Sequence, residues 1–180
     1  LCGGPNFEWH GELWVVNISN PSNPFEIGHS DTLKGAFGLC LSDSFAYIAD
    51  AAAGLRIINI ANPLNPQKIG HCDTPDDAYG VVVVDTLAYV AAHGSGLRII
   101  NVRDPTNPRE IGFYDTPGLA LSVTVVDTLA YVADLNGGMH ILSIANPQTP
   151  YTVGVHYPPG GPGYIAVEDS YAYIADGYSG

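Results

Sequence analysis

Aspartates recur at fixed places in this sequence, and their carboxylates are the groups best suited to chemistry. One set follows short apolar runs and comprises Asp31, Asp73, Asp76, Asp77 and Asp115. A second set ends runs such as Tyr-Val-Ala-Asp and comprises Asp50, Asp134 and Asp176. Calcium takes six to eight oxygen ligands, so carboxylates that gather on one face could hold it. The candidate metal ligands are Asp31, Asp73 and Asp115, and the candidate ligand or partner face comprises Asp50, Asp76, Asp77, Asp134 and Asp176.

A second interpretation of the same aspartates is structural. Each one lies where turn chemistry favours aspartate, whose side chain can hydrogen-bond the backbone of a tight turn. The sequence has no Asp-x-Asp-x-Asp-Gly calcium loop. Turn caps and a metal or ligand site therefore both remain open.

Other side chains do not assemble a catalytic set, and we assign no catalytic residue. The histidines are His10, His29, His71, His93, His140 and His156. Nothing places three of them at ligand spacing, and no Gly-x-Ser-x-Gly elbow is present. The cysteines are Cys2, Cys40 and Cys72, without a C-x-x-C pair. We expect Cys40 to be a small buried residue in an apolar strand.

The elements that must position these residues come from a repeat. The stretch Leu55-Arg56-Ile57-Ile58-Asn59-Ile60 recurs in related form from Leu13, Leu97 and Met139. The spacing of the copies is constant, because the differences 55 − 13, 97 − 55 and 139 − 97 all equal 42. Within each unit the runs are short, β-branched and bounded by turn residues, which predicts strands and leaves no room for a helix.

One unit predicts four strands, at 78–84, 87–91, 97–102 and 109–114. Asp85-Thr86 forms the first turn, a glycine-bearing turn follows the second strand, and Asp104-Pro105 ends the third strand. The second strands are apolar at consecutive positions, which indicates burial on both faces. Tyr47, Tyr89, Tyr131 and Tyr173 recur within them as a column that we expect to pack between neighbouring units. Four-stranded units of this length predict the blades of a β-propeller, with a solenoid of stacked sheets as the weaker alternative.

These residues carry a family resemblance. The core Leu-x-Ile-Ile-Asn-Ile, then Asn-Pro-x-Asn-Pro, Ile-Gly, Asp-Thr-Pro and Tyr-Val-Ala-Asp, resembles the LVIVD-repeat family of β-propellers over residues 13–180. The chain departs from the family's aspartate at the fifth core place, where it has Asn17, Asn59, Asn101 and Ser143. The resemblance implies an exported or cell-surface propeller of bacteria or archaea, in a family that largely lacks a defined biochemical activity.

The fold class we expect is all-β: a propeller of four-stranded antiparallel blades, with three complete blades and two terminal half blades. Residues 1–12 form a lead-in to one propeller domain or segment over residues 13–180. The complete blades span about 35–74, 77–116 and 118–157. The chain starts with the third and fourth strands of a blade, at 13–31, and ends with first and second strands, at 163–176.

The half blades leave strand edges that need partners, because exposed edges invite pairing. They could join each other in a four-bladed ring, or each could pair with the complementary half of a neighbouring molecule. A third alternative is that the chain, which begins with Leu1 rather than Met, is a segment of a longer propeller.

Composition narrows the function. With 18 acidic and 6 basic residues the formal net charge is −12, which argues against nucleic acid and anionic membranes as partners, and no apolar run is long enough for membrane insertion. We expect a non-enzymatic extracellular or cell-surface scaffold for binding or assembly, with a protein or glycan partner and no cofactor unless calcium binds. The alternative is a metal-dependent hydrolase or lyase that uses the acidic axial face. Asn17-Ile18-Ser19 is a usable glycosylation sequon, with Asn17 as the acceptor.

Overall fold

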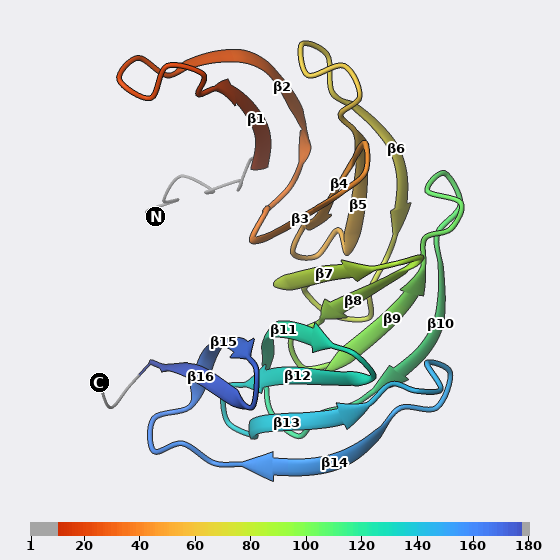
Figure 1. The fold of residues 1–180 in the computed structure, drawn as a ribbon. Coiled ribbons are helices and arrows are strands. Elements are labelled where there is room, and N and C mark those ends of the chain that lie inside the picture. The colour runs from red at the N-terminus through yellow and green to blue at the C-terminus, as the bar shows by residue number, and fades with distance from the viewer. Residues whose placement is uncertain (1–10, 178–180) are drawn as a thin grey trace, which may run out of the picture.

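The computed structural model describes residues 11–177, which form sixteen strands and no helix, arranged as an open arc of sheets (Figure 1). At the N-terminal end, β1 (Gly11–Asn17) pairs with β2 (Phe25–Leu33). The first complete sheet contains β3 (Gly38–Ser42), β4 (Phe45–Ala49), β5 (Leu55–Asn59) and β6 (Gln67–Cys72). The second contains β7 (Gly80–Val84), β8 (Leu87–Ala91), β9 (Leu97–Asn101) and β10 (Arg109–Tyr114). The third contains β11 (Ala120–Val126), β12 (Leu129–Asp134), β13 (Gly138–Ser143) and β14 (Tyr151–His156). At the C-terminal end, β15 (Pro162–Glu168) pairs with β16 (Tyr171–Asp176).

Each complete sheet is an antiparallel meander in which sequential strands are neighbours. Three four-stranded sheets and two two-stranded sheets confirm the predicted fold class of three blades and two half blades. The lead-in lies almost wholly outside the described residues. Among the described residues, none form a helix that is long and apolar enough to cross a membrane.

Two kinds of turn between strands depend on the type of one side chain. The first and second strands meet at an aspartate with positive φ, seen at Asp43 (52°), Asp85 (53°), Asp127 (52°) and Asp169 (52°). Aspartate is among the few non-glycine residues that adopt this left-handed conformation readily. After the third strand, the Oδ1 atoms of Asn17, Asn59 and Asn101 accept hydrogen bonds from the backbone N–H two residues later, at 2.9–3.0 Å. An amide oxygen performs this task as well as a carboxylate, so this turn does not need the family's aspartate.

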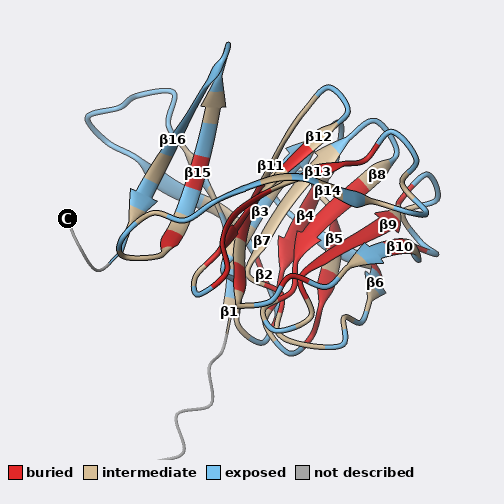
Figure 2. Cartoon of the chain, turned by 90° about the horizontal axis from the view of Figure 1, so that it is seen from below, coloured by how far each residue is buried: buried red, intermediate tan, exposed pale blue. Residues whose placement is uncertain are grey.

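The core lies between blades rather than within one sheet. The second strands β4 and β8 are buried from their second residue onward, as predicted (Figure 2). Ile57 and Ile100, each fully buried on neighbouring third strands, belong to one cluster that joins the first two blades. Burying such a side chain stabilises the fold by about 1.5–3 kcal/mol. Tyr47 packs in this cluster and Tyr89 packs in the next one, between the second and third blades, so this part of the tyrosine column is confirmed as core, whereas Tyr173 is exposed.

Backbone contacts also fix the spacing of neighbouring blades. Ala51 and Ala78 exchange two backbone hydrogen bonds (3.1 and 3.0 Å), and His93 and Ala120 do the same (3.1 and 2.9 Å). These bridges tie the turn after each second strand to the start of the next blade. They also explain why β7 begins at Gly80 rather than at residue 78 as predicted, because Ala78 pairs with the preceding blade.

Candidate functional site

The bridged turns and connections bring together aromatic side chains from two blades. Phe37 and Tyr79 precede the first strands of neighbouring blades, at the same place in the repeat (79 − 37 = 42), and their rings stack with centroids 4.6 Å apart. The ring of His93, from the turn after β8, stacks on Tyr79 at 5.2 Å. We call Phe37, Tyr79 and His93 the aromatic row. Phe37 at its free end is 59% exposed, so one ring face is open to a ligand.

An open cavity lies beside this row. Its volume is about 380 Å³, and Lys34, Phe37, Asp77 and Tyr79 contribute to its lining, together with the small residues Gly35, Ala51 and Ala52. Aromatic residues thus line one hollow together with a lysine and an aspartate. Such a combination suits a small ligand that has an apolar face and a polar rim.

Asp76 holds the inner end of the aromatic row in position. Its Oδ1 accepts the backbone N–H of Asp77 at 2.8 Å, and its Oδ2 accepts that of Gly94 at 3.0 Å. The same Oδ2 lies 3.4 Å from Nδ1 of His93. The backbone hydrogen bond from Asp77, followed by those from Gly94 and His93, lowers the pKa of Asp76 below its ordinary value, because these donors favour the carboxylate.

This network predicts an acid-sensitive turn. Since the pKa of Asp76 is lower in the folded chain, its contribution to stability is present above the ordinary aspartate pKa of about 3.9 and is lost as the pH falls through the lowered value. We expect the amide resonance of Gly94 to move with that titration, followed by NMR between about pH 6 and pH 2. In Asp76→Asn this resonance should lose the transition, and a transition retained in the variant would contradict the assignment.

The carboxylates that end the second strands point into the fold. Oδ1 of Asp50 accepts the backbone N–H groups of Lys34 and Gly35, both at 2.7 Å, and its Oδ2 lies 3.5 Å from Nε of Arg56. Asp134 accepts the N–H of Gly118 at 2.8 Å in the same way, and Asp176 accepts that of Gly160 at 2.9 Å. Asp50 and Asp134 are fully buried. They hold the connections between blades and are closed off from solvent, whereas Asp76 and Asp77 are partly exposed.

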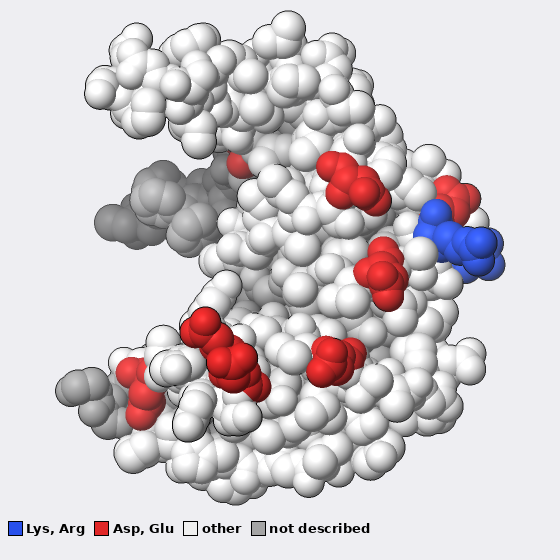
Figure 3. Space-filling model, in the orientation of Figure 1, with Lys and Arg blue, Asp and Glu red and all other residues white. Residues whose placement is uncertain are grey.

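The three candidate metal ligands are not brought together. Asp115 accepts a hydrogen bond from Arg98 at 2.9 Å, while Asp31 and Asp73 are exposed. Within residues 11–177, no three His, Cys, Asp or Glu side chains form a group that could hold a metal ion. On the face seen in Figure 3, acidic residues lie in separate patches along the arc. Calcium binding stays a prediction that this arrangement does not support.

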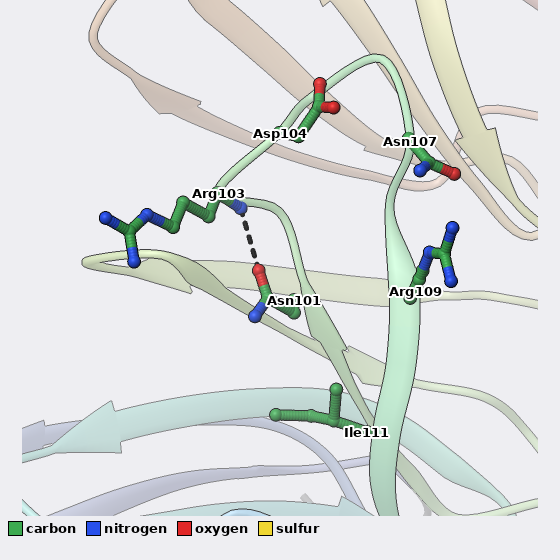
Figure 4. Close-up of a pocket in the computed structure, with 6 residues that line it drawn as sticks. All are labelled: Asn101, Arg103, Asp104, Asn107, Arg109 and Ile111. Carbon is green, nitrogen blue, oxygen red and sulfur yellow. Dashed lines mark hydrogen bonds between the residues drawn. The ribbon is translucent and has the colours of Figure 1, made fainter.

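A second cavity, of about 300 Å³, lies at the outer edge of the second blade. Its lining comprises Asn101, Arg103, Asp104, Asn107, Arg109 and Ile111 (Figure 4). The Arg103 guanidinium points away from that of Arg109, so the two cations do not converge on one anion. Asp104 instead accepts the hydroxyl of Thr106, which with the backbone N–H of that residue lowers the pKa of Asp104. The lining residues serve the turn, and we assign no binding role to this cavity.

The remaining candidate residues lie apart from the aromatic row. Asn17 ends β1, and its amide oxygen accepts the N–H of Ser19, the serine of the predicted sequon; glycosylation there stays a prediction. Cys40 is partly exposed rather than buried, and its Sγ accepts the N–H of Val83 in the next blade at 3.3 Å. Burial raises the pKa of the Cys72 thiol, which keeps it protonated and unreactive at neutral pH. Cys2 and His10 lie outside the described residues.

Sequence reasoning missed the aromatic row. A signal was present, because Phe37 and Tyr79 occupy one repeat position that holds Leu121 and Gly163 in the later copies. Two aromatic residues at a position that is otherwise not aromatic mark a local departure from the scaffold. The stacking with His93 has no comparable signal, because it depends on the bridge between the turn and the following blade.

The repeat has a match among known protein families. The sequence profile of the LVIVD repeat matches residues 8–32, 35–74, 75–116, 117–156 and 159–180. The chain belongs to the LVIVD repeat family. This confirms the resemblance of the core sequence and makes the protein a repeat scaffold. No curated protein matches this LVIVD-repeat chain.

Solved structures share the fold of this LVIVD-repeat protein at low sequence identity. The computationally designed Ika4 protein has a TM-score of 0.66 at 11% identity, covering 81% of this chain and 89% of its own. The designed Ika8 protein has a TM-score of 0.67 at 10% identity, covering 83% and 46%. A functionally unknown protein from Desulfotomaculum acetoxidans has a TM-score of 0.68 at 16% identity, covering 89% and 54%. The chain therefore spans about half the length of the last two.

Proposed function

We propose that this protein is a non-enzymatic extracellular or cell-surface scaffold that binds a glycan in the cavity beside the aromatic row. The observation that carries the proposal is the exposed ring of Phe37, fixed by stacking on Tyr79 at the mouth of a cavity of about 380 Å³. A sugar ring presents C–H groups on its face and hydroxyls at its rim. The aromatic face suits the first, and Lys34 and Asp77 suit the second.

The rigidity of the row supports binding over chemistry. Stacking of Tyr79 on Phe37 and on His93, together with the hydrogen bonds of Asp76, holds the rings before a ligand arrives. A preorganised site avoids part of the entropy cost of ordering side chains on binding. The formal net charge of −12 favours a neutral or cationic glycan over an anionic one.

A glycan array followed by calorimetric titration of the best ligand tests the proposal. We expect Phe37→Ala to weaken binding about 5- to 150-fold, which corresponds to the roughly 1–3 kcal/mol that stacking on an aromatic side chain contributes for a nucleobase. Tyr151→Ala is the matched control, because Tyr151 is similarly exposed (62%) on the outer strand β14. Equal affinity of both variants for the glycan, or binding of a protein partner that neither variant affects, would reject this site.

A further inference from the structure

The two half blades leave one strand edge each without a ladder partner in the described chain. β1 occupies the third place in a blade and pairs only with β2, and β16 occupies the second place and pairs only with β15. In a complete blade the second and third strands pair with each other, as β12 does with β13. The edges of β16 and β1 are therefore the two halves of one missing pairing.

The register of that pairing follows from the repeat. In the second blade Leu87 lies opposite Asn101, Tyr89 opposite Ile99 and Ala91 opposite Leu97. The equivalent residues two repeats away (2 × 42 = 84) are found by adding 84 on the second strand, which gives β16, and by subtracting 84 on the third strand, which gives β1. The same register then places Tyr171 opposite Asn17, Tyr173 opposite Val15 and Ala175 opposite Leu13. Every backbone group in these ladders then has a partner, which removes two exposed edges.

Apolar side chains beside both edges are exposed where their repeat equivalents are buried. Val16 on β1 is 45% exposed, whereas Ile58, Ile100 and Leu142 at the same repeat position are fully buried. Tyr173 is 59% exposed against 4% for Tyr89. On β3, Leu39 is 55% exposed, whereas its equivalent Ile165 is 1% exposed. In Figure 2 β16 is mostly exposed along its length, whereas Ile165 on β15 packs against the third blade.

Two grooves match the side chains that are missing from them. Between the first two blades, Tyr47, Ile57, Ala88 and Ile100 pack in one cluster. Their equivalents two repeats later, Tyr131, Ile141 and Ala172, line an empty groove of about 290 Å³ at the C-terminal end. The fourth member of the cluster, Ile100, has no equivalent two repeats later in the same chain. Its equivalent two repeats earlier is Val16 (100 − 84 = 16). Val16 lines a second groove, of about 210 Å³, with Leu39 and Leu41 beside β1.

The curvature of the arc keeps these two ends of one chain apart. At the inner edge, a Cβ on Gly38 would lie 2.6 Å from the carbonyl oxygen of Tyr79 in the next blade. At the outer rim, a Cβ on Gly70 would overlap the carbonyl oxygen of Pro105. Neighbouring blades are thus in backbone contact at both ends, so the angle between them is fixed. Bringing the half blades of one chain together would open the rim contacts, and the gap in Figures 1 and 3 remains.

We propose that a second copy of this chain closes the gap, with each β16 pairing with β1 of the other copy. Each copy supplies three complete blades and each of the two joints completes one more, giving a ring of eight blades (2 × 3 + 2). The arrangement has two-fold symmetry about the ring axis, and all joints between blades become equivalent. Two of the solved structures with this fold have about twice the length that this chain covers, which two copies would supply.

Gly154 provides a variant that affects the joint alone. Its equivalents Gly28, Gly70 and Gly112 lie against the carbonyl oxygens of Pro63, Pro105 and Pro147 in the following blade. A Cβ on Gly154 would meet only Cδ1 of Ile141 in its own chain, at 3.9 Å, and in the ring it would meet Pro21 of the second copy (147 − 126). Gly154→Val therefore leaves one chain intact and blocks its C-terminal side. Val16→Glu, at a half-exposed residue, blocks the N-terminal side.

Light scattering of the full chain after size exclusion tests the proposal. We expect the mass of two chains, 2 × 19.0 kDa, for the wild type and the mass of one chain, 19.0 kDa, for each variant, with unchanged far-UV circular dichroism. Leu64→Glu, which places the same charge on an exposed loop within the arc, should keep the mass of two chains. A wild-type mass of one chain, or of more than two, would overturn the closed ring of two.

Mixing the two variants separates pairing between copies from pairing within one. Val16→Glu retains a free C-terminal half blade and Gly154→Val retains a free N-terminal one, so one joint can form between them. We expect a species with the mass of two chains to appear only in the mixture, at high protein concentration. If the mixture keeps the mass of one chain, the joint does not form between copies and the proposal fails.

Discussion

Replacing Asp50 by alanine is expected to lower the free energy of unfolding by about 3–5 kcal/mol. The change removes the acceptor of two backbone hydrogen bonds, from Lys34 and Gly35, and leaves the guanidinium of Arg56 without its carboxylate. Asp50 is fully buried, so water cannot take over these contacts without opening the connection between blades. Denaturant unfolding followed by circular dichroism measures the loss.

Asp73→Ala is the control for this prediction. Asp73 is exposed and lies on the connection between the first and second complete blades. Its removal should change the unfolding free energy by less than about 0.5 kcal/mol. The second blade has Ala92 at the place of Asp50, and there Asp76 supports the turn through Gly94 instead. Equal stability of Asp50→Ala and Asp73→Ala would show that the buried carboxylate does not hold the blades together.

Gly112→Ala is expected to destabilise the protein by about 3 kcal/mol, at the upper end of the cost of overpacking. Its Cβ would overlap the carbonyl oxygen of Pro147 and lie 2.9 Å from Cα of Gln148, and backbone cannot move aside as a flexible side chain can. The affected contact is the outer rim between the second and third blades, so a loss there loosens the angle between them.

The matched control is Gly154→Ala, at the same repeat position but with open space beside it. Both changes are made in the Val16→Glu background, so that each protein is compared as a single chain. The control should stay within about 0.5 kcal/mol of its parent in denaturant unfolding. A similar loss at both positions would mean that glycine is needed for its backbone conformation and not for the close approach of the next blade.

Much of the fold could be predicted because the same strand and turn sequences occur in each copy of the repeat. The second strand at 87–91 and the fourth at 109–114 coincide with β8 and β10, since turn residues bound both. The start of the first strand was wrong by two residues. Ala78 looks like strand sequence and does pair, but with Ala51 of the preceding blade, and a contact between blades leaves no mark within one unit.

The candidate site was harder to foresee. The sequence predicts the same turn role for Asp50 and Asp76. In the structure Asp50 is buried and accepts two backbone N–H groups, whereas Asp76 lies beside the partly exposed His93. The difference depends on which connection passes over each carboxylate, and that is set by the packing of whole blades. The aromatic row likewise needs the distance between neighbouring blades, which brings Phe37 and Tyr79 together from successive repeats.

Both proposals depend on the same geometry but fail independently. The cavity beside Phe37 lies between the first two complete blades and is lined by residues within 34–79, none of which belongs to β1 or β16. Variants at Val16 or Gly154 should therefore leave glycan affinity per chain unchanged. Phe37→Ala should in turn leave the mass in solution unchanged.

The unbroken period of the repeat has a consequence for how such proteins can evolve. Because the repeat has a constant length of 42 residues, duplicating one whole unit within the chain would add a blade and leave the kind of joint between blades unchanged. Lengthening by one unit would therefore keep every joint between neighbouring blades of the same kind, but at a fixed angle between blades it would change the arc that a second copy has to close. Gene duplication could thus change the number of blades in a single step, with the rim contacts of Gly28, Gly70 and Gly112 setting which totals close into a ring.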